Sequence, residues 1–283
     1  MNLEVLHPGF NTTIQDSGRI NGLAYGVPRG GAMDLNLMYL ANKLVGNSRT
    51  NAVLEFTMKG GKYRFDEDSI IAYTGLGFAE VNSRRIEVNS RVCVKKNDIL
   101  TLSSGKKGRY NYLAIQGKIE ADEFWGSYST YELVKKGGFK GRKLQKEDVI
   151  SISKGFENNF FYESNNPKSP NIRVLRAPEF DHFPKNDHKR FVQQCFTVSS
   201  HSNRMGYRLN EAVLKGTKTG NIVSSGCIPG TIQVPSSGAP IVLMADSPTT
   251  GGYPRIGVIH PDDFGFFAQK MPGEIVKFEW FEF

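Results

Sequence analysis

SNRMGYRLN (residues 202–210), GCIPGTIQVPSSGAPIVLM (226–244) and ADSPTTGGYPR (245–255) together form the stretch around which the chain is organised. Short apolar runs of β type alternate here with glycine and proline at turn positions. The same stretch holds three arginines (Arg204, Arg208 and Arg255), the acid Asp246 and three amides (Asn203, Asn210 and Gln233). Polar, glycine-rich loops on a β scaffold are typical of a binding site.

The rest of the chain extends this β pattern. Six short runs with turn signals between them predict strands at 52–58, 62–65, 70–73, 91–94, 99–102 and 110–115. Many short strands at regular spacing indicate a closed or nearly closed β barrel. Short helices are expected at 35–45, 131–136, 187–195 and 262–271. Asp34 is a good N-cap for the first of them and Gly46 a good end, and Asp187 is the expected cap of the third.

Two mostly β domains are the expected organisation, because 283 residues are too many for one small core. Residues 155–170, rich in Asn, Ser and Pro, are the best linker. We therefore expect one domain at 1–160 and a second at 171–283. Each opens with a strand, at 3–6 and 172–175, which hints at a duplicated architecture.

Charge and composition exclude several classes of protein. Lys and Arg exceed Asp and Glu by 36 − 28 = 8, but this charge is scattered and matches no nucleic-acid motif. An acidic partner or a carboxylate ligand suits it better than nucleic acid. No apolar run is long enough to span a membrane and no signal peptide is evident, so a cytoplasmic protein is expected. Three isolated cysteines and five scattered histidines predict no metal site, and we expect the cysteines to be buried thiols.

The second half holds the main candidate site residues. Arg204 and Arg208 lie four positions apart, and arginine forks suit carboxylates and phosphates. The alternative for both is an ordinary surface salt bridge. Gln233 shares a strand face with Thr231 and is either a substrate-orienting amide or a satisfied barrel amide. Asp246 is expected to orient an arginine or to hold a substrate amine.

Further polar residues flank these candidates. In the same half we expect ligand contacts from Asn203, Thr250, Gly251, Gly252 and Tyr253, since adjacent glycines allow close backbone approach. A tight turn between two strands explains the glycines equally well.

The first half carries a second polar set. Gln15, Asp16 and Arg19 form a polar cluster in a loop, and we expect them to contact substrate as well. Glu55 lies inside an apolar strand, so it either points outward or needs a buried partner.

Eight blocks of sequence together resemble the biotin-dependent carboxyltransferase family typified by KipA and the C subunit of 5-oxoprolinase, also named allophanate hydrolase subunit 2. They occur in the family's order along almost the whole chain. The blocks are HPGFNTTIQDSGR (7–19), GVPRGGAMD (26–34), ANKLVGN (41–47), AVLEFT (52–57), GSYSTYELVKKGGFKGRKLQKED (126–148), SNRMGYRL (202–209), PGTIQVP (229–235) and ADSPTTGGYPRI (245–256).

The resemblance implies two cyclophilin-like β-barrel domains with a few short helices. It also implies a partner like KipI, the B component of 5-oxoprolinase, and a third protein like the A component. Such an assembly opens the lactam of 5-oxoproline to glutamate with ATP. On this reading the chain binds no cofactor itself and is inactive alone. Arg204, Gln233 and Asp246 are then the expected catalytic residues.

Two alternatives remain at this point. One is a KipA-like regulator that binds a KipI-like kinase inhibitor. The other is the carboxyltransferase component of a urea carboxylase-type system, which uses biotin carried by another protein.

Overall fold

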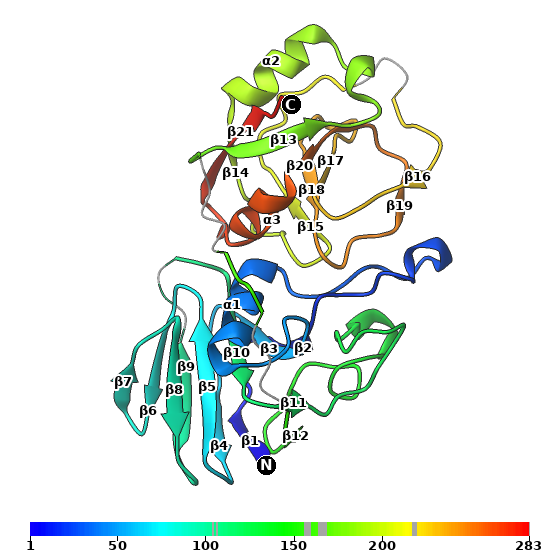
Figure 1. Cartoon of the computed structure of the whole chain (residues 1–283). Helices are drawn as coiled ribbons and strands as arrows, with labels where there is room; N and C mark the ends of the chain where they lie inside the picture. The colour runs from blue at the N-terminus through cyan, green and yellow to red at the C-terminus, as the bar shows by residue number, and fades with distance from the viewer. Residues whose placement is uncertain (104, 106, 156–159, 164–168, 217–219, 283) are drawn as a thin grey trace. The chain divides into compact units, whose positions relative to one another are not determined.

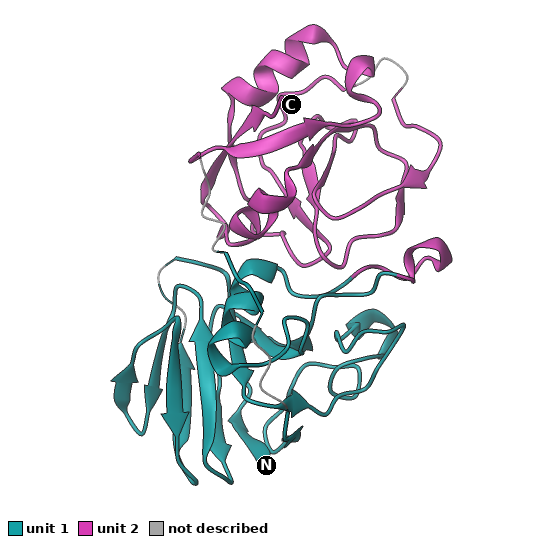
Figure 2. Ribbon diagram, in the orientation of Figure 1, with its two compact units in different colours: residues 1–20, 30–164 teal, residues 21–29, 165–283 magenta. Residues whose placement is uncertain are grey.

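The computed structural model describes residues 1–103, 105, 107–155, 160–163, 169–216 and 220–282 (Figure 1). The chain separates into two compact units (Figure 2). The first comprises Met1–Ile20 and Gly30–Ser164, and the second comprises Asn21–Arg29 and Asn165–Phe283. Part of the expected linker, 156–159 and 164–168, lies outside the described residues. The expectation of a mainly β protein with a few short helices is confirmed.

Unit 1 is built from two antiparallel sheets whose inner faces share one apolar core. The seven-stranded sheet, in the order β11-β12-β1-β4-β9-β6-β7, consists of β1 (Asn2–His7), β4 (Lys62–Phe65), β6 (Phe78–Val81), β7 (Arg84–Ile86), β9 (Ile99–Ser103), β11 (Lys118–Ile119) and β12 (Val149–Ser153). The five-stranded sheet, in the order β2-β3-β10-β5-β8, consists of β2 (Thr12–Gln15), β3 (Val53–Thr57), β5 (Ser69–Thr74), β8 (Ser90–Val94) and β10 (Tyr110–Ile115). Alternate residues such as Val5, Tyr63, Phe56 and Leu113 meet between the sheets, fully buried.

Helix α1 (Leu35–Val45) covers the other face of β5 and β10. The predicted bounds are confirmed: the Asp34 carboxylate accepts from the Asn36 and Leu37 amides, and Gly46 ends the helix at φ 75°. With sheet on one side and helix on the other, all six residues of β10 are buried.

Glu55 does not point outward but is buried with hydrogen-bond partners, which is the second of the two environments expected for it. Its Oε2 accepts from the Met33 amide and from the Tyr112 hydroxyl, both at 2.8 Å. The same hydroxyl accepts from the Asp34 amide at 2.7 Å. Burial and the neighbouring Glu55 charge raise the pKa of Tyr112 well above its ordinary value. Glu55 and Tyr112 thus satisfy the backbone that leads into α1.

Unit 2 is organised around one seven-stranded sheet in the order β14-β21-β13-β20-β17-β18-β15. Its strands are β13 (Ile172–Arg176), β14 (Cys195–Thr197), β15 (Gly206–Arg208), β17 (Thr231–Gln233), β18 (Ile241–Leu243), β20 (Arg255–Ile259) and β21 (Ile275–Trp280). A two-stranded ribbon pairs β16 (Ser225–Gly226) with β19 (Thr250–Gly251). Phe191, Phe196, Phe267 and Phe278 fill the core around β21.

The remaining helical elements are short, and two expectations about them were wrong. They are α2 (Lys185–Gln193), α3 (Pro261–Ala268), and the 3-10 turns η1 (Leu23–Tyr25), η2 (Glu132–Val134) and η3 (Phe180–His182). The helix expected at 131–136 is only the single turn η2. Asp187 does not cap α2, because Pro184 occupies that position with a preset φ of −58°. Asp187 instead lies buried within α2 and accepts from the Lys215 and Gly216 amides.

Candidate functional site

A row of four side chains crosses the outer face of the unit 2 sheet. The strand registers pair Arg208 with Ile241 and Ile241 with Gln233, and a register shift between Ile232 and Gln233 places Arg255 opposite Gln233. Residues directly opposite one another in a sheet point to the same side. The adjacent row, which includes Tyr207, Val242 and Ile232, is fully buried in the core. The alternation therefore directs the polar row away from the core.

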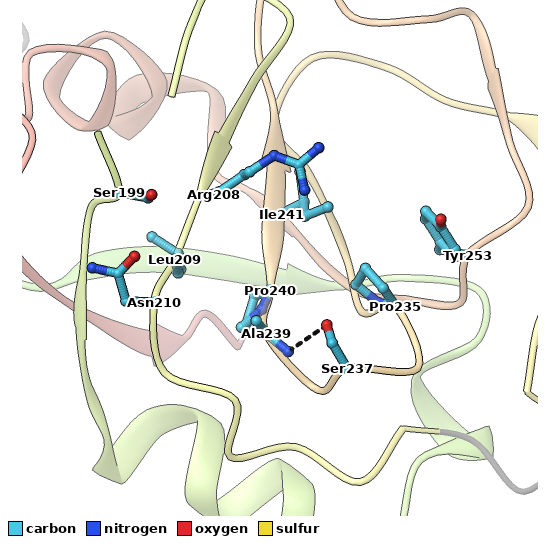
Figure 3. Close-up of a pocket in the computed structure, with 10 residues that line it drawn as sticks. All are labelled: Ser199, Arg208, Leu209, Asn210, Pro235, Ser237, Ala239, Pro240, Ile241 and Tyr253. Atoms are coloured by element: carbon cyan, nitrogen blue, oxygen red, sulfur yellow. Dashed lines mark hydrogen bonds between the residues drawn. The ribbon is translucent and has the colours of Figure 1, made fainter. Parts of the chain in front are cut away.

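A pocket of about 330 Å³ lies at the Arg208 end of this row (Figure 3). It is lined by Ser199, Arg208, Leu209, Asn210, Pro235, Ser237, Ala239, Pro240, Ile241 and Tyr253. Figure 3 shows the Arg208 guanidinium beside Ile241, with Tyr253 on the far side of Pro235. Its lining combines prolines and aliphatic side chains, which we call the apolar floor, with hydroxyl, amide and guanidinium groups.

Arg208 is the exposed cation of this pocket. Within the part of the chain that the structure describes, its guanidinium has neither an ion pair nor a side-chain hydrogen bond. An arginine fork above an apolar floor suits a small molecule that combines a carboxylate with an apolar ring. Sequence reasoning found Arg208 and Tyr253. It missed the floor residues, such as Pro240, which only the pairing of β15 with β18 brings to the site.

Gln233 lies further along the row and is buried under the β16–β19 ribbon. Its Nε2 is 3.7 Å from the Cys227 sulfur. A Cβ added to Gly251 would overlap Nε2, so the missing side chain lets the ribbon cross close to the Gln233 amide. Burial raises the pKa of the Cys227 thiol, and Arg255 partly opposes that shift. The expectation of buried thiols therefore fits Cys227, whereas Cys93 and Cys195 are exposed.

Arg255, at the other end of the row, forms an ion pair with Glu179. Its Nε and Nη2 donate to the two carboxylate oxygens of Glu179, both at 2.6 Å, and its Nη1 donates to the Gly226 carbonyl at 2.6 Å. Donation by Arg255 holds the pKa of Glu179 below its usual range. This pair fastens the β16–β19 ribbon to the sheet. Glu179 gave no signal in the sequence because its partner is 76 residues away.

Arg204 and Asp246 form a second ion pair, which lies away from Gln233. The Arg204 Nε and Nη2 donate to Asp246 Oδ2 and Oδ1 at 2.7 and 2.9 Å. Asp246 thus orients an arginine, which is one of the two roles expected for it; the other was to hold a substrate amine. Gln233 pairs with the start of β18, whereas Asp246 follows the end of that strand. The structure therefore brings together two of the three expected catalytic residues.

The remaining candidates of unit 2 lie in turns and in the ribbon. The Asn203 Oδ1 accepts from the Met205 amide at 2.8 Å and so shapes the turn that carries Arg204. Thr250 and Gly251 pair with Gly226 and Ser225, and the Gly252 carbonyl accepts from the Ile222 amide. Arg204 and Arg208 do not share a strand, because β15 begins only at Gly206.

The Gln15, Asp16 and Arg19 cluster of unit 1 is buried and internally bonded. Asp16 accepts from the Ser127 hydroxyl at 2.7 Å, the Tyr128 amide at 2.7 Å and the Gly18 amide at 2.8 Å, and also from the Ser129 hydroxyl. Arg19 donates to the carbonyls of Phe124 and Ser129. The Gln15 amide donates to Thr13 at 3.0 Å. These contacts tie the segment around residues 124–131 to β2.

The described residues carry neither a metal cluster nor a membrane-spanning helix. They contain no group of three or more His, Cys, Asp or Glu side chains placed to hold a metal ion. Among them no helix is both long and apolar enough to cross a membrane.

The architecture defines a class of protein. The chain superposes on the structure of Kluyveromyces lactis urea carboxylase with a TM-score of 0.89 and 30% identity, over 98% of this chain and 27% of that one. It is thus a carboxyltransferase-type β protein.

Sequence comparison gives the family. The family model described as carboxyltransferase domain, subdomain A and B, matches residues 25–280. The chain belongs to this family, and the resemblance inferred from its sequence blocks is confirmed. It is 36% identical to the 5-oxoprolinase C subunit of Escherichia coli K12, over 98% of this chain and 90% of that protein. It is 31% identical to the 5-oxoprolinase C subunit of Haemophilus influenzae, with the same two coverages.

Proposed function

We propose that this chain is the C subunit of an ATP-dependent 5-oxoprolinase, which opens the lactam of 5-oxoproline to give glutamate. Two relatives of that name match it over nearly the full length of both proteins. A-type and B-type 5-oxoprolinase polypeptides complete the enzyme, the B-type one resembling KipI, and the chain alone is inactive. The complex uses ATP, and we assign no cofactor to this chain. The cytoplasm is the proposed location.

The observation that carries the proposal is the Arg208 pocket. Its volume, about 330 Å³, is at the lower end of the range for small-molecule sites. 5-Oxoproline is a small ring with one carboxylate, and the pocket offers one exposed guanidinium over an apolar floor. We assign Arg208 to the substrate carboxylate and the prolines and Ile241 to the ring. Tyr253, 40% exposed at the edge, supplies a hydroxyl to the polar side of the lactam.

Ring opening also requires a polarised carbonyl and a stabilised oxyanion. We assign these tasks to Gln233 and to the backbone of Thr250, Gly251 and Gly252, which lie along the same face beyond Ile241. Arg204 is paired with Asp246 away from Gln233, so we assign it to a second anionic group rather than to the lactam carbonyl, with Asn203 holding its turn.

Gln15, Asp16 and Arg19 act differently from our expectation of substrate contact. Because they are buried and bonded within unit 1, we assign them to positioning of the 124–131 segment.

A three-component assay tests the proposal. This chain and its A-type and B-type polypeptides are purified and mixed with 5-oxoproline and ATP. Glutamate should form only when all three proteins are present. ATP-dependent glutamate release by the other two polypeptides alone would overturn the proposal.

One alternative has an observation in its favour, the structural match to urea carboxylase. In that system a carboxylated biotin, which is also an anion, would meet Arg208. Carboxyl transfer from biotin on a separate carrier, without glutamate release, would identify it. A KipA-like regulator would instead bind a KipI-like protein without any turnover.

A further inference from the structure

The turn at 132–143 of unit 1 combines exposed apolar side chains with a cluster of lysines. Leu133 is 77% exposed and Val134 is 45% exposed, at the tip of η2. The sequence ELVKKGGFKGRK over these residues holds five basic residues and one acid, an excess of four positive charges. We refer to Leu133, Val134, Lys135, Lys136, Lys140 and Lys143 as the basic turn.

The lysines of the basic turn are exposed and available. Lys135, Lys136, Lys140 and Lys143 have no ion-pair partner within the described residues. Arg142 differs, because it forms a bidentate pair with Asp148 at 2.7 and 2.8 Å. The acid in the turn, Glu132, accepts at its Oε1 from the Lys143 amide at 3.2 Å.

Backbone packing holds these lysines close together. A Cβ on Gly141 would overlap the Lys135 carbonyl group, so the chain at 140–141 lies directly against residues 135–136. The Gly141 amide donates to the Gly137 carbonyl at 2.9 Å. Lys135 and Lys140 both adopt a left-handed conformation at φ 54°, which non-glycine residues avoid unless their surroundings impose it.

The buried polar cluster beneath the turn imposes this geometry. The Arg19 guanidinium lies over the Tyr131 ring, 5.7 Å from its centre, and Gly137 packs beside it. Tyr131 and Lys136 close the turn by exchanging backbone hydrogen bonds of 2.8 and 3.3 Å. The Thr130 amide donates to the Ile14 carbonyl at 2.9 Å, which joins the segment to β2. The turn is therefore built in one shape before any partner arrives.

We propose that the basic turn is a docking surface for an acidic protein partner, with Leu133 and Val134 entering an apolar pocket of that partner. Exposed aliphatic side chains ringed by cations match the usual arrangement of an apolar centre and a charged rim. A preformed shape lowers the cost of ordering on association. These exposed lysines favour negative charge on the partner opposite them, which sets both orientation and association rate.

The experiment rests on the proposed function only for its probes, the A-type and B-type 5-oxoprolinase polypeptides. Their binding to the full chain is measured at about 0.05 M and about 0.3 M salt, a range over which exposed charges become screened. Leu133→Ser should weaken binding to one of them about tenfold. Lys135→Glu with Lys136→Glu should weaken it about 100-fold at low salt and remove most of its salt dependence.

Matched controls lie elsewhere on unit 1. Leu76 is 57% exposed and Lys62 is an exposed residue of β4, so Leu76→Ser and Lys62→Glu should leave binding unchanged. Thermal unfolding of all variants checks that they are folded. If the basic-turn variants bind as tightly as the unmodified chain, the docking proposal is wrong while the proposed function stands. If the unmodified chain binds neither polypeptide, both proposals fail. Binding that depends on the turn, without glutamate formation, supports docking and rejects the oxoprolinase.

Discussion

Arg19 of unit 1 and Arg208 of unit 2 differ in one decisive respect. Arg19 is 1% exposed, donates to two backbone carbonyls and lies against two aromatic rings. Arg208 is exposed in a pocket, and its guanidinium has no partner within the described residues. The sequence suggested substrate contact for both. What separates them is the number of hydrogen bonds already made inside the protein, because a donor that is occupied in the free protein adds little to binding.

The largest effect should come from the buried cluster of unit 1, in which the polar groups are already hydrogen-bonded. The substitution Asp16→Ala removes the carboxylate that accepts hydrogen bonds from two hydroxyls and two backbone amides in a buried site. Those four donors are then left unsatisfied. We expect the free energy of unfolding of unit 1 to fall by about 3 kcal/mol or more, measured by urea denaturation. Glu123→Ala, an exposed acid of the same segment, is the control and should change it by less than about 0.5 kcal/mol. An unchanged urea midpoint for Asp16→Ala would show that the network does not hold the segment.

The second effect tests the available arginine. Arg208→Ala in the reconstituted three-protein enzyme should lower kcat/KM for 5-oxoproline about 100-fold, or about 2.7 kcal/mol. Because Arg208 makes no intramolecular pair within the described residues, thermal unfolding should not change. Arg208→Lys keeps the charge without the fork and should recover only part of the activity. Full activity of Arg208→Ala would remove the carboxylate anchor from this pocket.

The comparison also explains how much the sequence could predict. Helix α1 was predicted with its bounds because its signals, Asp34 and Gly46, act on the adjacent turns. Strand β20 was missed, and so were Glu179 and Cys227, because their places depend on pairing with distant segments. The row from Arg208 through Ile241 to Gln233 needs the register of three strands, which spacing within one strand cannot supply. Hydrogen bonds between neighbouring residues can thus be predicted from the sequence. Whether a side chain is already bonded to residues far away in the sequence cannot.

The third effect concerns the Glu179–Arg255 ion pair and its contribution to the stability of unit 2. Glu179→Gln leaves Arg255 without its carboxylate and should lower the free energy of unfolding of unit 2 by about 2 kcal/mol at pH 7. The sign of the pH dependence follows from the lowered pKa of Glu179. The stability that this pair contributes is present above the ordinary pKa of 4.5 and is lost as the pH falls through the lower folded value. Urea denaturation from pH 7 downward should show the wild-type and variant values converge. A constant difference across that range would mean that the Glu179 charge is not what stabilises the ribbon.

The smallest effect concerns Arg204, which lies between the two extremes because it is both paired and partly exposed. Arg204→Ala should lower kcat/KM about tenfold, equivalent to about 1.4 kcal/mol, if the guanidinium contacts substrate as well as Asp246. The Arg204–Asp246 pair is nearly as buried as the Arg255–Glu179 pair, so the unfolding free energy should also fall, by about 1 kcal/mol. Asp246→Ala and the double variant complete a cycle that separates the two roles. If Arg204 acts on substrate through its orientation by Asp246, the loss in the double variant will equal that of Arg204→Ala. Normal kinetics in Arg204→Ala would show that the Arg204–Asp246 pair only stabilises its own turn, as Asp16 and Arg19 do in unit 1. Arg208 would then be the cation that binds substrate.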